Sequence, residues 1–175
     1  MILWYDDNLP YEPEMLDLLK DFQREGTDYG RSKYYSNYEV KGKHLELVPV
    51  LGDYLRDFYH DHVKRMTKDL GIFGQWRYTN EYWTQLYYKG SDTHGIHSHF
   101  GNGAVVSWVH ILQAPEDQDC FYFVDSKMNK MYPKHQRSNT LFCFPSWSLH
   151  AVDRLRDEGE RVIVAGNILF NNIEI

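Results

Sequence analysis

The chain has 175 residues, of which 42% are hydrophobic and 16% aromatic, and its formal net charge is −6. This length suits one domain with a sizeable core, and the negative charge argues against nucleic acid as the main partner. The two cysteines, Cys120 and Cys143, stand in apolar runs, which predicts buried free thiols in a reducing compartment. No apolar stretch reaches membrane-spanning length and no secretory pattern opens the chain, so we expect a soluble cytoplasmic protein.

The first part of the chain is predicted to be helical. Apolar residues at three- and four-residue steps predict one helix over Tyr11–Arg24 and a second from about Leu45 to Leu70, which Gly71 ends. We expect both helices to buttress a sheet. His60 and His62 fall in the second helix, where residues two apart do not share a face, so we interpret them as surface or partly buried residues.

From about residue 76 the pattern changes to strands, because runs rich in β-branched and aromatic residues alternate with turn formers. Gly101–Gly103 predicts a hairpin-type turn, and Ser126–Arg137 a polar loop. Short strands that follow two helices indicate an antiparallel sandwich or barrel with helices on one face. The predicted strands are Met1–Tyr5, Trp76–Tyr88, His97–Phe100, Ala104–Leu112, Cys120–Val124, Thr140–Phe144, Leu149–Leu155 and Arg161–Phe170.

Three histidines suggest a metal site. His97 and His99 are two residues apart, and on a strand such side chains point to the same side. His150 lies far downstream, but ligands from an early and a late strand can meet inside a sandwich or barrel. Imidazole binds Fe, Zn, Cu and Ni, and three protein ligands leave positions open for water or substrate.

Three motifs, in this order and spacing over Trp83–Phe170, resemble the iron(II)- and 2-oxoglutarate-dependent oxygenases. The chain is most similar to the small bacterial and phage branch of that superfamily, which is related to the prolyl 4-hydroxylases. The motifs are a tyrosine strand, a glycine turn and His-x-His (Tyr88, Gly90, His97, His99), then Phe-Pro-x-Trp-x-x-His (Phe144–His150), then an arginine-led apolar strand that includes asparagine (Arg161–Asn167).

The resemblance implies a single domain over residues 1–175. Its helical part, about 1–75, is expected to pack on one sheet of a double-stranded β-helix (jelly-roll, cupin-like) core over about 76–172. The implied activity is that of a dioxygenase that uses Fe(II), O₂ and 2-oxoglutarate as co-substrate. Such an enzyme decarboxylates 2-oxoglutarate to succinate and hydroxylates a small-molecule or peptidyl substrate. His97, His99 and His150 are expected to hold the iron and to be the catalytic residues.

Arg161 matches the position of the family's 2-oxoglutarate arginine, whose guanidinium offers a bidentate fork to the far carboxylate. Asn167 shares the face of Arg161 by strand alternation and could point into the same cavity. Tyr88 could hydrogen-bond the co-substrate. The segments Tyr34–Tyr38 and Asp125–Arg137 are candidate substrate-covering elements by length and composition.

Several alternatives stay open. The wider superfamily usually carries Asp or Glu where this chain has His99, so either His99 is the second ligand or Asp92 or His94 replaces it. A three-histidine cupin-type metal dioxygenase without 2-oxoglutarate, and a non-catalytic jelly-roll binding module, are the other two functions compatible with the pattern. His110 lies in the middle of a strand and is interpreted as a hydrogen-bonded core histidine.

Overall fold

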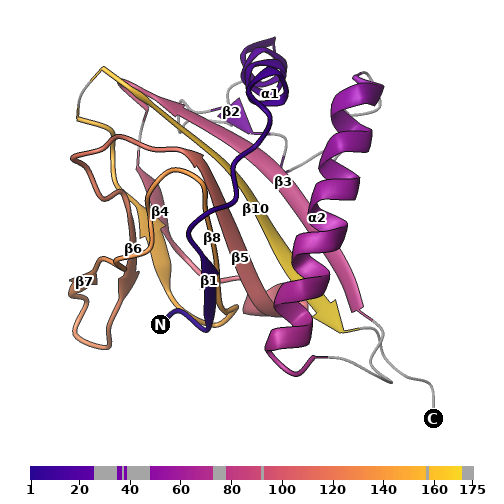
Figure 1. The fold of residues 1–175 in the computed structure, drawn as a ribbon. Coiled ribbons are helices and arrows are strands. Elements are labelled where there is room, and N and C mark those ends of the chain that lie inside the picture. Colours follow the sequence, from indigo (N-terminus) through magenta and orange to yellow (C-terminus); the bar gives the residue numbers. More distant parts are fainter. Residues whose placement is uncertain are drawn as a thin grey trace.

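The computed structural model of the chain describes residues 1–25, 35–36, 38, 48–72, 78–91, 93–156 and 158–170. Strands dominate these residues, and two α-helices accompany them (Figure 1). The elements in chain order are β1 (Trp4–Asp6), α1 (Pro13–Glu25), β2 (Tyr35–Ser36), α2 (Pro49–Asp69), β3 (Tyr78–Tyr88), β4 (His94–His97), a 3-10 helix (Phe100–Asn102), β5 (Ala104–Gln113), β6 (Phe121–Val124), β7 (Lys130–Met131), β8 (Thr140–Pro145), β9 (His150–Val152) and β10 (Glu160–Phe170).

The described strands form two antiparallel sheets. The larger has the order β1-β8-β5-β10-β3-β2, and the smaller has the order β4-β9-β6-β7. Long β10 lies inside the larger sheet, where it pairs with β3 on one side and β5 on the other. The prediction of antiparallel sheets that follow helices is therefore confirmed.

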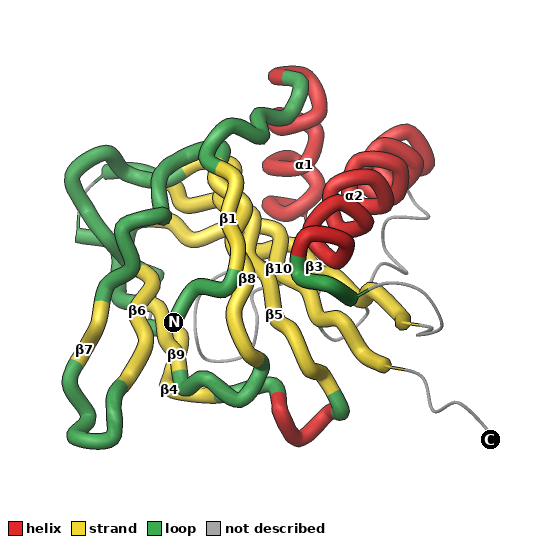
Figure 2. Tube along the Cα trace, turned by 60° about the horizontal axis from the view of Figure 1, so that its bottom comes forward, coloured by secondary structure: helices red, strands yellow, loops and turns green. Residues whose placement is uncertain are grey.

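Strand alternation divides the larger sheet into two buried faces. On β10, Val162 and Val164 join a core cluster that includes helix residues, whereas Ile163 and Ala165 join a second cluster with residues of the smaller sheet. The larger sheet is thus a middle layer. The helices cover one face and the smaller sheet covers the other, as Figure 2 shows from a turned view.

Helix α2 packs on the larger sheet through one apolar stripe, as its spacing predicts. Pro49 stands in its first turn, where a missing N–H costs nothing, and Gly71 follows its end with φ of +74°. His60 is exposed and His62 is partly buried, as expected. The buried residues of the stripe are Leu51, Leu55, Tyr59, Val63 and Met66.

Three local predictions differ from the structure. The strand expected over His97–Phe100 covers His94–His97 instead, with a register shift inside it, and a 3-10 helix follows. That helix ends at Asn102 and is capped by Gly103, whose φ is +74°. Because β4 and β5 on either side belong to different sheets, the predicted hairpin turn is absent there. The loop predicted over Ser126–Arg137 contains β7, which pairs with β6. The limits of β4 depend on its pairing with β9, which is distant in the chain, so local spacing does not record them. Strand β7, by contrast, pairs with β6 just before it in the chain.

Other residue predictions are confirmed. His110 is fully buried, and its ring nitrogens meet the Tyr59 hydroxyl at 2.8 Å and the Leu9 carbonyl oxygen at 2.7 Å. Cys120 and Cys143 are buried free thiols. Among the described residues, neither helix is long and apolar enough to cross a lipid bilayer.

Candidate metal centre and its pocket

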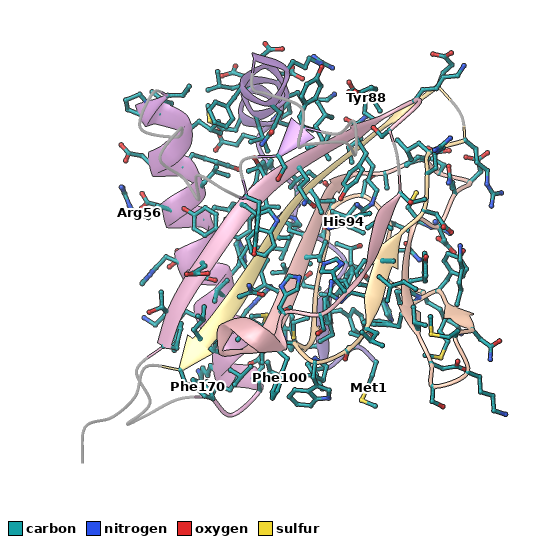
Figure 3. The ribbon with its side chains drawn as sticks, turned by 180° about the vertical axis from the view of Figure 1, so that it is seen from behind. Met1, Arg56, Tyr88, His94, Phe100 and Phe170 are labelled. Carbon is teal, nitrogen blue, oxygen red and sulfur yellow. The ribbon has the colours of Figure 1, made fainter. Side chains whose placement is uncertain are left out.

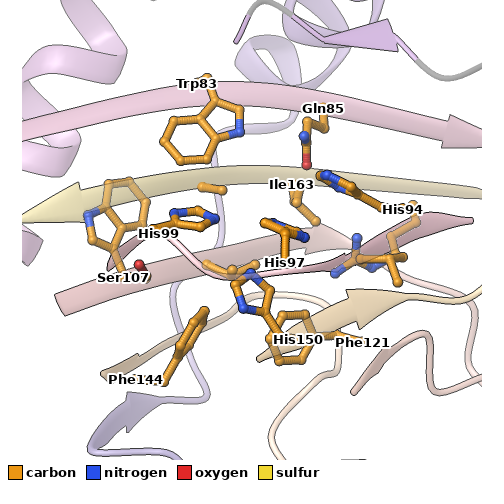
Figure 4. Close-up of a pocket in the computed structure, with 15 residues that line it drawn as sticks. Trp83, Gln85, His94, His97, His99, Ser107, Phe121, Phe144, His150 and Ile163 are labelled. Carbon is orange, nitrogen blue, oxygen red and sulfur yellow. The ribbon is translucent and has the colours of Figure 1, made fainter. Parts of the chain in front are cut away.

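The structure brings His97, His99 and His150 together between the two sheets. One ring nitrogen from each lies within 4.8 Å of the others. The ring centroids are 4.3 Å apart for His97 and His150, and 5.1 Å apart for His99 and either of the others. Figure 4 shows the three rings turned toward a common centre, an arrangement that can hold one metal ion.

Backbone pairing places these histidines. His97 and His150 are direct partners in the antiparallel ladder of β4 and β9, so their side chains leave the same face. His99 lies beyond the end of β4, where its N–H donates to the carbonyl oxygen of Ser146 at 2.9 Å. Strand alternation, the reason given above for His97 and His99 sharing a side, therefore does not apply to His99.

Each of the three imidazoles is held through its Nδ1 atom. Nδ1–H of His97 donates to the carbonyl oxygen of Gly95 at 2.8 Å, and Nδ1–H of His150 donates to the carbonyl oxygen of Ser148 at 2.9 Å. Nδ1–H of His99 donates to Oδ1 of Asn167 at 2.7 Å. Because an oxygen acceptor at Nδ1 places the proton there, Nε2 of each ring carries the lone pair that a metal needs.

Burial keeps these rings neutral. It is the main cause that lowers the pKa of His97 and His99, and it lowers the pKa of His150 to about 2, with the charge of His97 as the next cause. The pKa of nearby His94 falls to about 3, first through burial and then through His97. At neutral pH the centre therefore offers unprotonated ligands.

The centre opens onto a pocket that also contains Arg161. This arginine is 1% exposed, and its guanidinium carbon lies 5.3 Å from the ring centroid of Tyr87. Its Nη1 and Nη2 atoms are buried and have no hydrogen-bond partner among the described residues. A buried guanidinium without an acceptor is costly, so this pocket suits an anion. The lining residues are Trp83, Gln85, His94, His97, His99, Ser107, Trp108, Val109, Phe121, Phe144, His150, Val152, Arg161, Ile163 and Ala165.

The structure does not bring Tyr88 to this pocket. Its ring lies against Tyr35 of β2, with centroids 5.3 Å apart. Because Tyr87 pairs with Arg161, alternation puts Tyr88 on the other face of the larger sheet. Figure 3 shows Tyr88 apart from His94, which lines the pocket. The neighbouring Tyr87 pairs directly with Arg161 across the β3–β10 ladder and so shares its face. Its hydroxyl donates to Oε1 of Gln85 at 3.0 Å and lies 3.3 Å from Nδ1 of His94.

Tyr87 is thus the tyrosine that contacts the buried Arg161, and the sequence reasoning missed it, although its side chain is not one of those that line the pocket. Tyr87 and Tyr88 leave opposite faces of β3. The register between β3 and β10 decides which of them meets Arg161, and the sequence of neither strand gives that register by itself.

Asn167 lies on the same face of β10 as Arg161, as predicted, but it contacts His99 on the side of the ring that carries Nδ1. Besides the bond from His99, its Oδ1 accepts a hydrogen bond from Oγ of Ser107 at 2.9 Å. It is 3% exposed and is not one of the residues that line the pocket. The structure therefore places Asn167 beside a candidate ligand rather than in the pocket with Arg161.

The structure describes one of the two alternatives to His99 as second ligand, His94, but not the other, Asp92. His94 lines the pocket and stacks on His97 with centroids 4.4 Å apart, but its ring nitrogens are not part of the converging group. A register shift between His94 and His97 lets both residues of β4 face the pocket. Asp92, the other alternative, lies outside the described residues.

The comparisons with known proteins find similarity in structure only. No protein-family model and no curated protein matches the chain. A 2OG-Fe(II) oxygenase family oxidoreductase from Burkholderia pseudomallei matches with TM-score 0.56 and 16% identity, over 91% of this chain and 79% of that one. A Pseudomonas putida prolyl-4-hydroxylase matches with TM-score 0.56 and 17% identity, over 94% and 92%.

A third match is the epimerase SnoN, solved in complex with Fe³⁺, alpha ketoglutarate and nogalamycin RO. Its TM-score is 0.62 and its identity 10%, over 94% of this chain and 77% of that one. Together, the arrangement of strands and these matches show that the chain has the fold of the 2OG-Fe(II) oxygenases.

Proposed function

We propose that this protein is an Fe(II)- and 2-oxoglutarate-dependent dioxygenase that hydroxylates an unidentified substrate while 2-oxoglutarate is decarboxylated to succinate. The observation that carries the proposal is one pocket that holds both three converging neutral imidazoles and a buried guanidinium with no acceptor among the described residues. The fold supports it, since the solved structures that share the fold include oxygenases.

The donor set fits iron. Neutral imidazole is a borderline ligand that suits Fe(II), and three protein ligands leave three positions of an octahedral ion open for co-substrate and O₂. His97, His99 and His150 would hold the metal through their Nε2 atoms, since Nδ1 of each is occupied. When bound, iron supplies the activation of O₂ and the oxidation of the substrate.

Arg161 fits the far carboxylate of a 2-oxo diacid. Its two Nη groups, which have no acceptor among the residues that the structure describes, present N–H donors that match a carboxylate in a bidentate pair. Tyr87, whose ring lies beside this guanidinium, can donate its hydroxyl to the same carboxylate in place of Gln85. The apolar side chains of Phe121 and Ile163 line the same pocket and would contact the methylene groups and exclude water.

The substrate side of the centre stays a proposal. Tyr38 packs edge-on against Trp83, a lining residue, with centroids 4.8 Å apart, which supports the segment Tyr34–Tyr38 as part of a cover. Of that segment, residues 34 and 37 lie outside the described residues. The segment Asp125–Arg137 is the second candidate.

We further propose that the two sheets form the double-stranded β-helix (jelly-roll) core of a single domain. The proposed core spans about residues 76–172, with the helical part of about 1–75 on the outer face of the larger sheet. Burial supports it, because the larger sheet contributes to one core with the helices and to another with the smaller sheet.

The test is an anaerobic titration of the metal-free protein with Fe(II) and then 2-oxoglutarate, followed by visible absorption. We expect a charge-transfer band that needs both additions and is lost in His150→Ala. In Arg161→Ala the band should require roughly a hundredfold more 2-oxoglutarate, because a charge-assisted bidentate pair is lost. Arg56→Ala, which removes an exposed arginine of α2 paired with Asp53, is the matched control.

Two other outcomes would redirect the assignment. The three converging ligands include no carboxylate, so a three-histidine dioxygenase without 2-oxoglutarate is the second candidate function. Iron binding with no response to 2-oxoglutarate would favour it. No iron binding at all would favour a non-catalytic binding module.

A further inference from the structure

His99 depends on a distant residue for its orientation, unlike the other two candidate ligands. His97 and His150 each donate from Nδ1 to a backbone carbonyl two residues earlier, so their own segments hold them. The acceptor for His99 is the side chain of Asn167, which lies 68 residues away on β10. A change at Asn167 should therefore act on one ligand of the three.

A closed circuit of hydrogen bonds surrounds this contact. Oδ1 of Asn167 accepts from Nδ1–H of His99 at 2.7 Å and from Oγ of Ser107 at 2.9 Å. Oγ of Ser107 meets Oγ of Ser146 at 3.0 Å, and the carbonyl oxygen of Ser146 accepts the backbone N–H of His99 at 2.9 Å. His99 is thus fixed both through its ring and through its main chain.

The chemistry of the circuit leaves one tautomer for His99. The hydroxyl proton of Ser107 is directed to Oδ1 of Asn167, so this oxygen is an acceptor in both of its bonds. His99 must then carry its proton on Nδ1, which leaves Nε2 as the nitrogen whose lone pair it can offer to a metal. Asn167, Ser107 and Ser146 are 3%, 1% and 0% exposed, so water does not compete for these bonds.

We propose that Asn167 is a positioning residue for the third metal ligand, fixing the Nδ1–H tautomer of His99 and aiming its Nε2 at the centre. The inference rests on the proposed function in so far as His99 is a metal ligand there. It changes the role expected for Asn167, which acts through His99 and does not touch the co-substrate. Partners that orient a metal-bound imidazole contribute about 10- to 100-fold to metal affinity.

The first measurement reads the tautomer directly. The metal-free full-length protein, with ¹⁵N-labelled histidine, is examined by two-bond ¹H–¹⁵N correlation NMR. We expect His99 to be the Nδ1–H tautomer in the wild type and a mixture of tautomers in Asn167→Leu, which keeps the side-chain size but offers no acceptor. A merely structural role for Asn167 would leave the tautomer unchanged.

The second measurement is Zn(II) affinity, obtained by competition with a chromogenic chelator. Asn167→Leu should bind Zn(II) about 10- to 100-fold more weakly than the wild type. The matched control is Asn80→Leu, because Asn80 lies on neighbouring β3 and its Oδ1 accepts a comparable bond, from Nε1 of Trp108 at 2.9 Å. Asn80→Leu should keep wild-type Zn(II) affinity.

Asn167→Asp is the second variant, and it covers the case in which Asn167→Leu fails to fold. A carboxylate accepts the same bond from His99, so the tautomer should persist and Zn(II) should bind at least as tightly as in the wild type. The inference is overturned if Asn167→Asp loses the tautomer or weakens Zn(II) binding tenfold. It is also overturned if Asn167→Leu folds and keeps both the tautomer and the affinity.

The outcomes separate this inference from the proposed function. A wild type that binds Fe(II) and 2-oxoglutarate, together with an Asn167→Leu protein that keeps both the His99 tautomer and the Zn(II) affinity, overturns only the role of Asn167. A wild type that binds neither Fe(II) nor Zn(II) overturns both.

Discussion

The direction in which a side chain leaves its strand decides which single residues lie on the same face of the sheet as Arg161. Tyr87 and Tyr88 are neighbours of the same type, yet only Tyr87 lies beside the Arg161 guanidinium, while Tyr88 packs on Tyr35. Because both side chains are tyrosines, any difference between the effects of replacing them would come from their position alone. That makes the pair a matched test of the pocket.

We expect Tyr87→Phe to raise the concentration of 2-oxoglutarate needed for the iron charge-transfer band by about tenfold, because one hydrogen bond to a charged group is lost. Tyr88→Phe should leave this concentration unchanged. Both variants keep the ring, so packing against Arg161 or Tyr35 persists. Equal effects of the two substitutions would contradict the placement of the co-substrate beside Arg161.

Among the elements, β10 links the fold to the candidate site. Its residues belong to both core clusters, and it carries Arg161 and Asn167. Its helix-side face includes Gly166, directly opposite Trp108 of β5 and Tyr82 of β3. A Cβ atom at Gly166 would lie 2.4 Å from the Trp108 ring and 2.5 Å from the backbone oxygen of Glu81. The close packing of the indole on this strand therefore requires glycine.

We predict that Gly166→Ala lowers the free energy of unfolding by roughly 1–3 kcal/mol, because overpacking forces the Trp108 ring and the adjoining strand to move. The measurement is urea unfolding followed by tryptophan fluorescence. Gly159→Ala is the control, since the nearest atom to a Cβ there is a Pro115 side-chain carbon at 3.9 Å. Equal stability of the two variants would show that β10 tolerates the added atom.

For the molecule as a whole, buried histidines couple stability to pH. Burial lowers the pKa of His94 and His110 to about 3 and that of His150 to about 2, from an ordinary value of 6.5. Below pH 6.5 the unfolded chain therefore binds protons that the folded protein does not. The stability that these neutral rings allow is fully present above pH 6.5 and declines as the pH falls from there toward 3.

We predict that the metal-free protein loses up to about 2 kcal/mol of unfolding free energy per buried histidine between pH 6.5 and pH 5. Urea unfolding at the two pH values measures it. His110→Gln should reduce the pH-dependent loss by about 2 kcal/mol, because His110 lies outside the metal centre and is fully buried. His60→Gln, at an exposed position of α2, is the control. A stability independent of pH in this range would refute the prediction.

Much of the fold could be predicted where a pattern repeats within one element. The apolar steps of α2 and the aromatic runs of β3, β5 and β10 place those elements to within a few residues. Short β4 was misplaced, because its hydrogen bonds come from β9, more than fifty residues away in the chain. A strand of four residues has too little sequence of its own to mark its limits.

The sequence by itself determined which residue types are available to the centre: three histidines and an arginine, in an order that resembles the oxygenases. Only the tertiary structure decided that His99 joins His97 and His150 from outside a strand, that Tyr87 rather than Tyr88 faces Arg161, and that Asn167 lies behind His99. The physical reason is that side-chain identity is local, whereas register is a property of paired strands. A shift of one residue in either strand would reverse which side chains meet.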